Sequence, residues 1–229
     1  RPLSSAESEY SMTSSSPLTD PAQSYLAALL NTDRAQATNV IMDAVARGVS
    51  IKTIYLDIFQ AALYEIGRLW QTNHISVAQE HYCTAATQMI MAQLYPHIFN
   101  TKRVGRRMIA TCVSGELHEI GIRMVADFFE MEGWDTYYVG ANMPIRDIIS
   151  IMEAQEVHLL CISATMQSSL VAAADIIEAV RASEVGQPVK ILVGGSAFLQ
   201  REDLWVKIGA DGFGRNADDA LRLAALLVN

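Results

Sequence analysis

Four short apolar segments decide the fold: MIATCV (108–113), DTYYVG (135–140), HLLCISA (158–164) and KILVGG (190–195). Each is followed by a stretch with helical periodicity, over residues 117–132, 145–155, 167–183 and 198–208. A last short strand near 211–213 and a helix over 217–227 complete the alternation. This β-α repeat predicts an α/β fold with a five-stranded parallel sheet, helices on both of its faces and right-handed crossovers.

The first part of the chain has a different period. From residue 21 to 100, apolar residues recur at helical spacing. Gly48 suits a helix end and Ser50 suits a new N-cap. Ser76 and Gln79 have the spacing of a capping box, which predicts the start of a fourth helix. Four helices with short connections predict an all-α four-helix bundle ahead of the sheet.

Composition places the boundaries of these parts. Residues 1–20 are rich in Ser and contain few aliphatic side chains, so we expect a disordered tail outside the fold. The segment 101–107 is basic, contains a glycine and separates the two periodicities, so it is the predicted linker. The predicted domains are therefore the bundle at 21–100 and the α/β domain at 108–229.

The charge balance excludes some classes of function. The 229 residues contain 17 Lys and Arg against 25 Asp and Glu, a net charge of −8, so a direct nucleic-acid contact is not expected. No window approaches the run of about 18 apolar residues that a membrane-spanning helix needs. Three cysteines without a CxxC pair, and no export signal, favour a cytoplasmic protein.

Ligands of parallel sheets bind at the carboxyl ends of the strands. The first predicted strand is followed by SGELHEIG (114–121), in which Glu116 stands two residues before His118. A carboxylate at this position fixes the tautomer of a histidine, whose other nitrogen then binds a metal or moves a proton. A single loop histidine is more often a solvated residue, so this pair alone is weak evidence. Neither a P-loop nor a GxGxxG motif follows a strand.

Small and hydroxyl-bearing residues follow the third and fourth predicted strands. They are Ser163, Thr165, Gly194 and Gly195. Such residues at adjacent strand ends predict a deep slot, because glycine leaves room for a ligand to approach the backbone. A Gly-Gly pair that merely ends a strand is the alternative.

Taken together, these residues resemble the DxHxxG…SxL…GG signature of cobalamin-binding domains. The matching residues are Glu116, His118, Gly121, Ser163, Gly194 and Gly195. The resemblance covers roughly residues 105–229 and implies a flavodoxin-like cobalamin-binding domain. It implies that His118 is the lower ligand of cobalt in place of the dimethylbenzimidazole base. It also implies that Glu116 holds the second ring nitrogen of His118.

The same resemblance implies a pocket for the displaced nucleotide tail, lined by Ser163 and the glycine pair 194–195, and close packing at Gly121 where the helix begins. Two residues depart from the family's pattern. Glu116 stands where the family usually has Asp, and Thr165 stands where it usually has Leu. These departures leave a heme-binding variant, or a variant that has lost its ligand, as alternatives.

A helical bundle ahead of such a domain resembles the cap of methionine synthase, of methyl-carrying corrinoid proteins and of light sensors. Trp70, followed nine residues later by Glu80 and His81, resembles the upper-face motif of B12 photoreceptors of the CarH type. There the indole packs on the upper axial group, and the Glu and His flank it. Some sensors have a His after the Trp, but this chain has Gln71, which leaves His74, His81 or no residue as a second cobalt ligand.

The stretch VSGELHEIGIRMVADFFEMEGWDTYYVGANMP (113–144) resembles the AerR/PpaA antirepressors, which lack a DNA-binding module. This resemblance implies a non-enzymatic, light-sensing transcriptional regulator that binds adenosylcobalamin, methylcobalamin or hydroxocobalamin. Its implied partner is a transcriptional repressor of the PpsR/CrtJ kind, and a homo-oligomer or a fragment of a longer repressor stays open. The alternative function is a corrinoid methyl carrier of a methyltransferase system. Trp70 favours the sensor, because a methyl group does not need a large aromatic lid.

Overall fold

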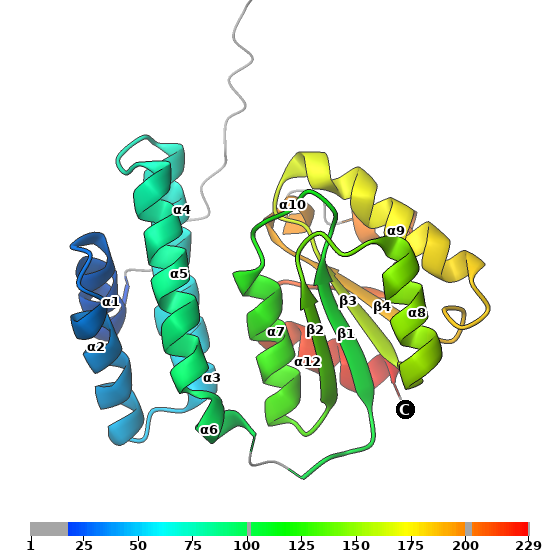
Figure 1. Cartoon of the computed structure of the whole chain (residues 1–229), viewed down its shortest axis with the longest axis horizontal. Coiled ribbons are helices and arrows are strands. Elements are labelled where there is room, and N and C mark those ends of the chain that lie inside the picture. Colours follow the sequence, from blue (N-terminus) through cyan, green and yellow to red (C-terminus); the bar gives the residue numbers. More distant parts are fainter. Residues whose placement is uncertain (1–17, 100–101, 200–202, 229) are drawn as a thin grey trace, which may run out of the picture. The chain divides into compact units, whose positions relative to one another are not determined.

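A computed structural model of the chain describes residues 18–99, 102–199 and 203–228 (Figure 1). The chain divides into two compact units, Arg1–Thr87 and Gln88–Asn229. Residues 1–17 of the expected disordered tail lie outside the described residues, and the first helix begins at Asp20. Each unit is described by itself below.

The first unit is helical, as the spacing of its apolar residues predicts. Its elements are α1 (Asp20–Leu30), α2 (Arg34–Ala46), α3 (Ile51–Thr53), the π-helix η1 (Ile54–Gln60), α4 (Ala61–Gln71) and α5 (Val77–Gln93), whose last residues belong to the second unit. The core contains the rings of Tyr25, Tyr55 and Phe59, all fully buried. The centroids of Tyr25 and Phe59 are 5.4 Å apart, and the Tyr25 hydroxyl forms a buried hydrogen bond with Thr87 Oγ1 at 2.9 Å.

The predicted helix ends are confirmed. Gly48 follows Arg47, the C-cap of α2, and has φ +78, a conformation that glycine adopts without strain. Ser50 is the N-cap of α3, where its hydroxyl accepts the Thr53 N–H at 3.1 Å. Ser76 and Gln79 form the capping box: each side chain accepts the other residue's backbone N–H, at 3.2 and 3.1 Å.

A π-helical segment, η1, interrupts the third helix, which the helical periodicity predicts as continuous from about residue 51 to 70. Along η1 and α4, buried residues recur every four positions, at Ile54, Ile58, Ala62 and Ile66. In an α-helix a four-residue spacing drifts by about 40° per turn. The wider turn of the π-helix offsets that drift. The local unwinding thus keeps this apolar stripe on one face of the helix.

The second unit has the predicted β-α alternation. Its elements are α6 (Tyr95–Ile98), β1 (Arg107–Cys112), α7 (Ile120–Met131), β2 (Asp135–Gly140), α8 (Ile145–Gln155), β3 (Leu159–Ser163), the 3₁₀ turn η2 (Gln167–Ser169), α9 (Leu170–Ala182), β4 (Lys190–Gly194), α10 (Ser196–Leu199), α11 (Leu204–Lys207), β5 (Gly212–Gly214) and α12 (Ala217–Leu227). The helix expected over 198–208 includes residues 200–202, which lie outside the described residues; on either side of them the chain forms α10 and α11.

The five strands form one parallel sheet in the order β2-β1-β3-β4-β5, which confirms the predicted fold class. α7 and α12 cover one face, where Phe129 and Ala224 join the core, and α8 and α9 cover the other, where Met152 and Ile176 do so (Figure 1). The register aligns the carboxyl ends of the central strands, because Ser163 lies opposite Cys112 on one side and Gly194 on the other.

The segment ahead of β1 is bound to this unit. Arg103 donates to the backbone oxygen of Trp134 at 2.7 Å, and its guanidinium lies 2.5 Å from the buried carboxylate of Glu130. The guanidinium of Arg106 lies over the Trp134 ring, 5.7 Å from its centroid. The described residues of the predicted linker therefore pack on the turn between α7 and β2. Among all described residues, no helix is both long and apolar enough to cross a bilayer.

Candidate functional site

The loop between β1 and α7 holds a hydrogen-bonded carboxylate and imidazole. Glu116 is only 1% exposed, and its Oε1 accepts hydrogen bonds from the Nδ1 and the backbone N–H of His118, the latter at 3.2 Å. The side chain of His118 is 41% exposed. Because an ionised carboxylate only accepts hydrogen bonds, the proton of a neutral ring is on Nδ1. Nε2 is then the nitrogen with a lone pair for a metal.

The second oxygen of Glu116 connects this loop to the one that follows β3. Oε2 accepts the backbone N–H groups of Thr165 and Met166, both at 3.0 Å, and the hydroxyl of Ser169 at 3.2 Å. Burial by itself raises the pKa of this carboxyl, but the hydrogen bonds from His118, Met166 and Thr165 outweigh burial and lower the pKa to about 2. Glu116 is thus a charged group that joins two loops at the carboxyl edge of the sheet.

The other residues predicted from the strand ends lie at the same edge. Ser163 ends β3 and is 7% exposed, and Gly194 ends the neighbouring β4. Thr165 accepts the hydroxyl of Ser196 with its backbone oxygen, at 2.9 Å. The structure therefore brings these residues together with Glu116 within one unit, as their positions after the predicted strands indicate.

The three glycines of the predicted signature have different surroundings. Gly195 has φ +98, and a Cβ there would lie 2.3 Å from the backbone oxygen of Ala164. A Cβ on Gly194 would lie 3.1 Å from the backbone oxygen of Gly214. Gly121 lies in the first turn of α7, and a Cβ there would meet no atom within 4 Å. The glycine pair is thus packed against backbone, whereas Gly121 faces open space.

The predicted upper-face residues belong to the first unit, on either side of the connection between α4 and α5. Trp70 is in the last turn of α4, and Glu80 is in the first turn of α5. The carboxylate of Glu80 accepts the Thr84 hydroxyl at 3.0 Å and lies 2.5 Å from Nδ1 of His81. Glu80 and His81 therefore form a pair held by one helix.

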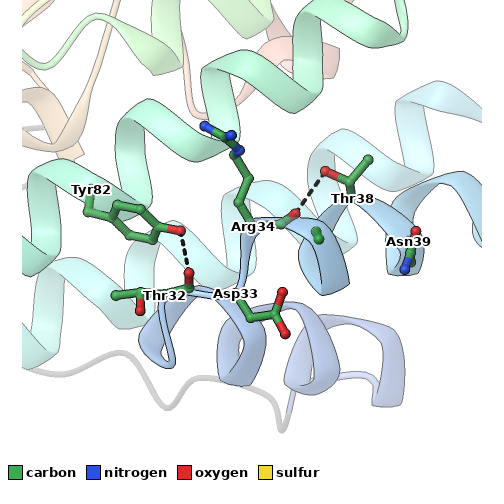
Figure 2. A pocket seen from close by; sticks show the side chains of 7 residues that line it. Thr32, Asp33, Arg34, Thr38, Asn39 and Tyr82 are labelled. Atoms are coloured by element: carbon green, nitrogen blue, oxygen red, sulfur yellow. Dashed lines mark hydrogen bonds between the residues drawn. The ribbon is translucent and has the colours of Figure 1, made fainter.

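A separate concavity of about 680 Å³ lies in the first unit, between the turn from α1 to α2 and the helix α5 (Figure 2). Its lining consists of Thr32, Asp33, Arg34, Ala35, Thr38, Asn39 and Tyr82. The Tyr82 hydroxyl donates to the backbone oxygen of Thr32 at 2.7 Å. No residue of the predicted site lines this concavity.

Two residues of the strand-end site do not follow from the sequence signature. Ser169 binds Glu116, as described above. Asn142 follows β2, and its Oδ1 accepts the backbone N–H of Gly115 at 2.7 Å. Asn142 could have been found in the same way as Glu116, because both are polar residues just past a predicted strand.

Known families match both parts of the chain. A B12 binding domain family matches residues 106–222, and a second B12 binding domain family matches residues 21–95. The chain belongs to the B12-binding domain family. Cobalamin is its cofactor, and the N-terminal helices are the cap that precedes the cobalamin-binding sheet domain.

Relatives of this B12-binding chain include corrinoid proteins of Methanosarcina species. It is 29% identical to dimethylamine corrinoid protein 1 of Methanosarcina mazei, over 72% of its own length and 74% of the relative's. It is 26% identical to trimethylamine corrinoid protein 1 of Methanosarcina acetivorans, over 85% and 90% of the two lengths. The solved structure of Methanosarcina barkeri monomethylamine corrinoid protein has the same fold, with a TM-score of 0.80 at 21% identity over 89% and 96% of the two chains.

These relatives correct one expectation. The predicted partner, a repressor of the PpsR/CrtJ kind, is wrong, because the relatives named above are corrinoid proteins of methylamine systems by their names. The family matches support the predicted architecture, a helical cap followed by a cobalamin-binding domain.

The residues at the strand ends fit a cobalamin. Within the described ranges, no three His, Cys, Asp or Glu side chains come together to hold a bare metal ion. A single exposed imidazole with a buried carboxylate behind it suits a metal whose other ligands come from its own macrocycle. His118 and Glu116 supply this arrangement.

Proposed function

We propose that this B12-binding chain is a corrinoid methyl carrier of a methyltransferase system. The observation that carries the proposal is the Glu116–His118 pair at the carboxyl edge of the sheet, in a chain whose relatives are methylamine corrinoid proteins. When bound, cobalamin supplies a cobalt that accepts a methyl group and gives it up again. The chain is then not itself an enzyme, and separate methyltransferases catalyse the transfers.

His118 is the lower ligand of cobalt in this proposal. Its Nδ1 is hydrogen-bonded to Glu116, so Nε2 is the nitrogen left with a lone pair, on a side chain that is 41% exposed. A carboxylate behind an imidazole fixes the ring and raises the basicity of the ligating nitrogen. Because Oε2 of Glu116 is held by Thr165 and Met166, the ring has a fixed support rather than a flexible one.

The remaining strand-end residues would bind the nucleotide tail. Ser163, Thr165 and the glycine pair 194–195 stand together at the ends of β3 and β4. Gly121 leaves open space beside the first turn of α7. We propose that these residues line the route of the tail, and that the alignment of the strand ends makes that route continuous.

The carrier role is tested by following a labelled methyl group. The full chain is loaded with cobalamin, reduced, and mixed with isotopically labelled mono-, di- or trimethylamine and a soluble extract of its native cells. Label should appear on the chain-bound cofactor with at least one amine, and the His118→Ala chain should acquire less under the same conditions. Absence of label with all three methylamines would contradict the carrier role.

A light-responsive protein is the second candidate, and one observation favours it. Glu80 and His81 form a hydrogen-bonded pair at the start of α5, and Trp70 stands at the end of α4 on the other side of the same connection. An indole gives a rigid apolar surface for a bulky adenosyl group, and a carboxylate accepts hydrogen bonds from a ribose. We propose no repressor as its partner.

Illumination separates the two candidates. The chain is loaded in the dark with adenosylcobalamin, and its visible spectrum and hydrodynamic size are measured before and after green light. A light-responsive protein changes both. A methyl carrier changes its spectrum alone, because photolysis of the cofactor then has no structural consequence.

A further inference from the structure

Asn142 lies in the loop that joins β2 to α8, beside the loop that carries His118. Its φ of +57 is in the left-handed region, which Asn enters more readily than most residues. Its Oδ1 accepts the backbone N–H of Gly115 at 2.7 Å. The two residues are 27 positions apart in sequence, so this bond joins the loops that follow two neighbouring strands.

Gly115 belongs to the tight turn that leads from β1 toward His118. The N–H of Glu116 donates to the backbone oxygen of Val113 at 3.2 Å, which closes a four-residue turn. Gly115 is the third residue of that turn and has φ +79, as a type II turn requires. The turn's own hydrogen bond uses the N–H of its fourth residue. The N–H of Gly115 is therefore the one that Asn142 binds.

The loop that carries His118 is consequently held from both sides. β1 lies between β2 and β3 in the sheet (Figure 1). On the β3 side, Glu116 accepts hydrogen bonds from Thr165, Met166 and Ser169. On the β2 side, Asn142 holds Gly115. Without the Asn142 amide, this loop would keep its hydrogen bonds on the β3 side but lose the hydrogen bond between Gly115 and Asn142.

We propose that Asn142 is a positioning residue, which fixes the height of His118 at the sheet edge and hence the approach of its Nε2 to cobalt. The proposal deepens the proposed function and rests on its assignment of His118 as the lower ligand. Gly115 precedes the buried Glu116 directly, so a displacement of the turn moves the carboxylate. The imidazole moves with it, because Glu116 Oε1 binds both Nδ1 and the backbone N–H of His118.

Three substitutions separate the hydrogen bond from the backbone conformation. Asn142→Gly keeps the left-handed conformation, because glycine adopts positive φ readily, but it removes the acceptor. Asn142→Asp keeps an acceptor at the same position, and Asp also tolerates this conformation. Asn73→Gly is the matched control, because Asn73 has the same φ of +57 and lies in the first unit.

The test uses the full chain, labelled with ¹⁵N-histidine and loaded with cobalamin in the Co(II) state. Electron paramagnetic resonance then shows whether the nitrogen on cobalt is ¹⁵N from the protein or ¹⁴N from the cofactor's base. Asn142→Gly should reduce the ¹⁵N-bound fraction and weaken cobalamin binding by about tenfold, the lower end for residues behind a metal ligand. Asn142→Asp and Asn73→Gly should keep the wild-type fraction.

The outcomes distinguish the role of Asn142 from that of His118. Equal ¹⁵N-bound fractions and equal affinities in wild type and folded Asn142→Gly would overturn the role of Asn142 alone. If wild type shows no ¹⁵N coupling, the assignment of His118 fails, and the role of Asn142 falls with it. If Asn142→Gly does not fold, Asn142→Ala also lacks the acceptor, and an unchanged ¹⁵N-bound fraction there overturns the proposal.

Discussion

Glu116 is buried and His118 is partly exposed, although one hydrogen bond joins their side chains. The carboxylate is 1% exposed and the imidazole 41%. The pair therefore keeps the negative charge inside the protein while part of the imidazole stays exposed. Because a charge this deeply buried is costly without partners, its five hydrogen bonds are a condition for keeping the carboxylate ionised.

Replacement of His118 tests the ligand directly. In His118→Ala we expect either loss of cobalamin on gel filtration or retention with the benzimidazole base still on cobalt, which shifts the visible spectrum. Both results follow from loss of the imidazole that the loop between β1 and α7 carries. His97→Ala is the control, because His97 is exposed on α6 and has no predicted role. Coordination that is the same in His118→Ala and wild type would contradict the assignment.

The stability of the chain without cofactor should depend on the Glu116 carboxyl. Its pKa is about 2 in the folded chain, below the ordinary value of 4.5. A depressed pKa stabilises the fold above pH 4.5, and this contribution is lost as the pH falls toward 2. We expect wild type to lose about 2 kcal/mol more free energy of unfolding than Glu116→Gln between pH 6 and pH 3. Urea unfolding measures both chains, and parallel pH profiles would refute the expectation.

Features set by neighbouring residues were predictable from the sequence. The Ser76–Gln79 capping box needs residues only three positions apart, and the structure contains both of its hydrogen bonds. The parallel strands follow from short apolar runs, because a sheet covered on both faces buries most residues of its central strands, as in β1 and β3. The contact between His118 and Glu116 was predictable for the same reason, because the two residues are only two positions apart in one loop.

Features that depend on how distant loops meet were not predictable. Ser169 reaches Glu116 across 53 positions, and Asn142 reaches Gly115 across 27. These contacts depend on the register of β1 with its two neighbours, which no local pattern encodes. The π-helical segment at 54–60 was also not predicted, because apolar residues four positions apart are equally typical of an ordinary α-helix.

Gly195 offers a test of whether a strand-end glycine is needed for packing. Both Gly195 and Gly209 have positive φ, at +98 and +82. A Cβ on Gly195 would lie 2.3 Å from the Ala164 backbone oxygen, whereas one on Gly209 would be 3.6 Å from the nearest side-chain atom. Gly209→Ala should cost about 1 kcal/mol of unfolding free energy from backbone strain alone. Gly195→Ala should cost clearly more in urea unfolding, and equal losses would show that the contact relaxes freely.

Trp70→Ala tests what the end of α4 does to the cofactor. If the indole packs on the upper axial group, its removal should weaken adenosylcobalamin binding by roughly tenfold, because up to a few kcal/mol of apolar contact is lost. Hydroxocobalamin is the matched ligand, since its small upper group offers the indole little to contact. Isothermal titration of both ligands into wild type and variant, with melting temperatures as a check on folding, measures the difference. Equal weakening for the two ligands would make Trp70 a structural residue of the bundle and remove the main support for a light response.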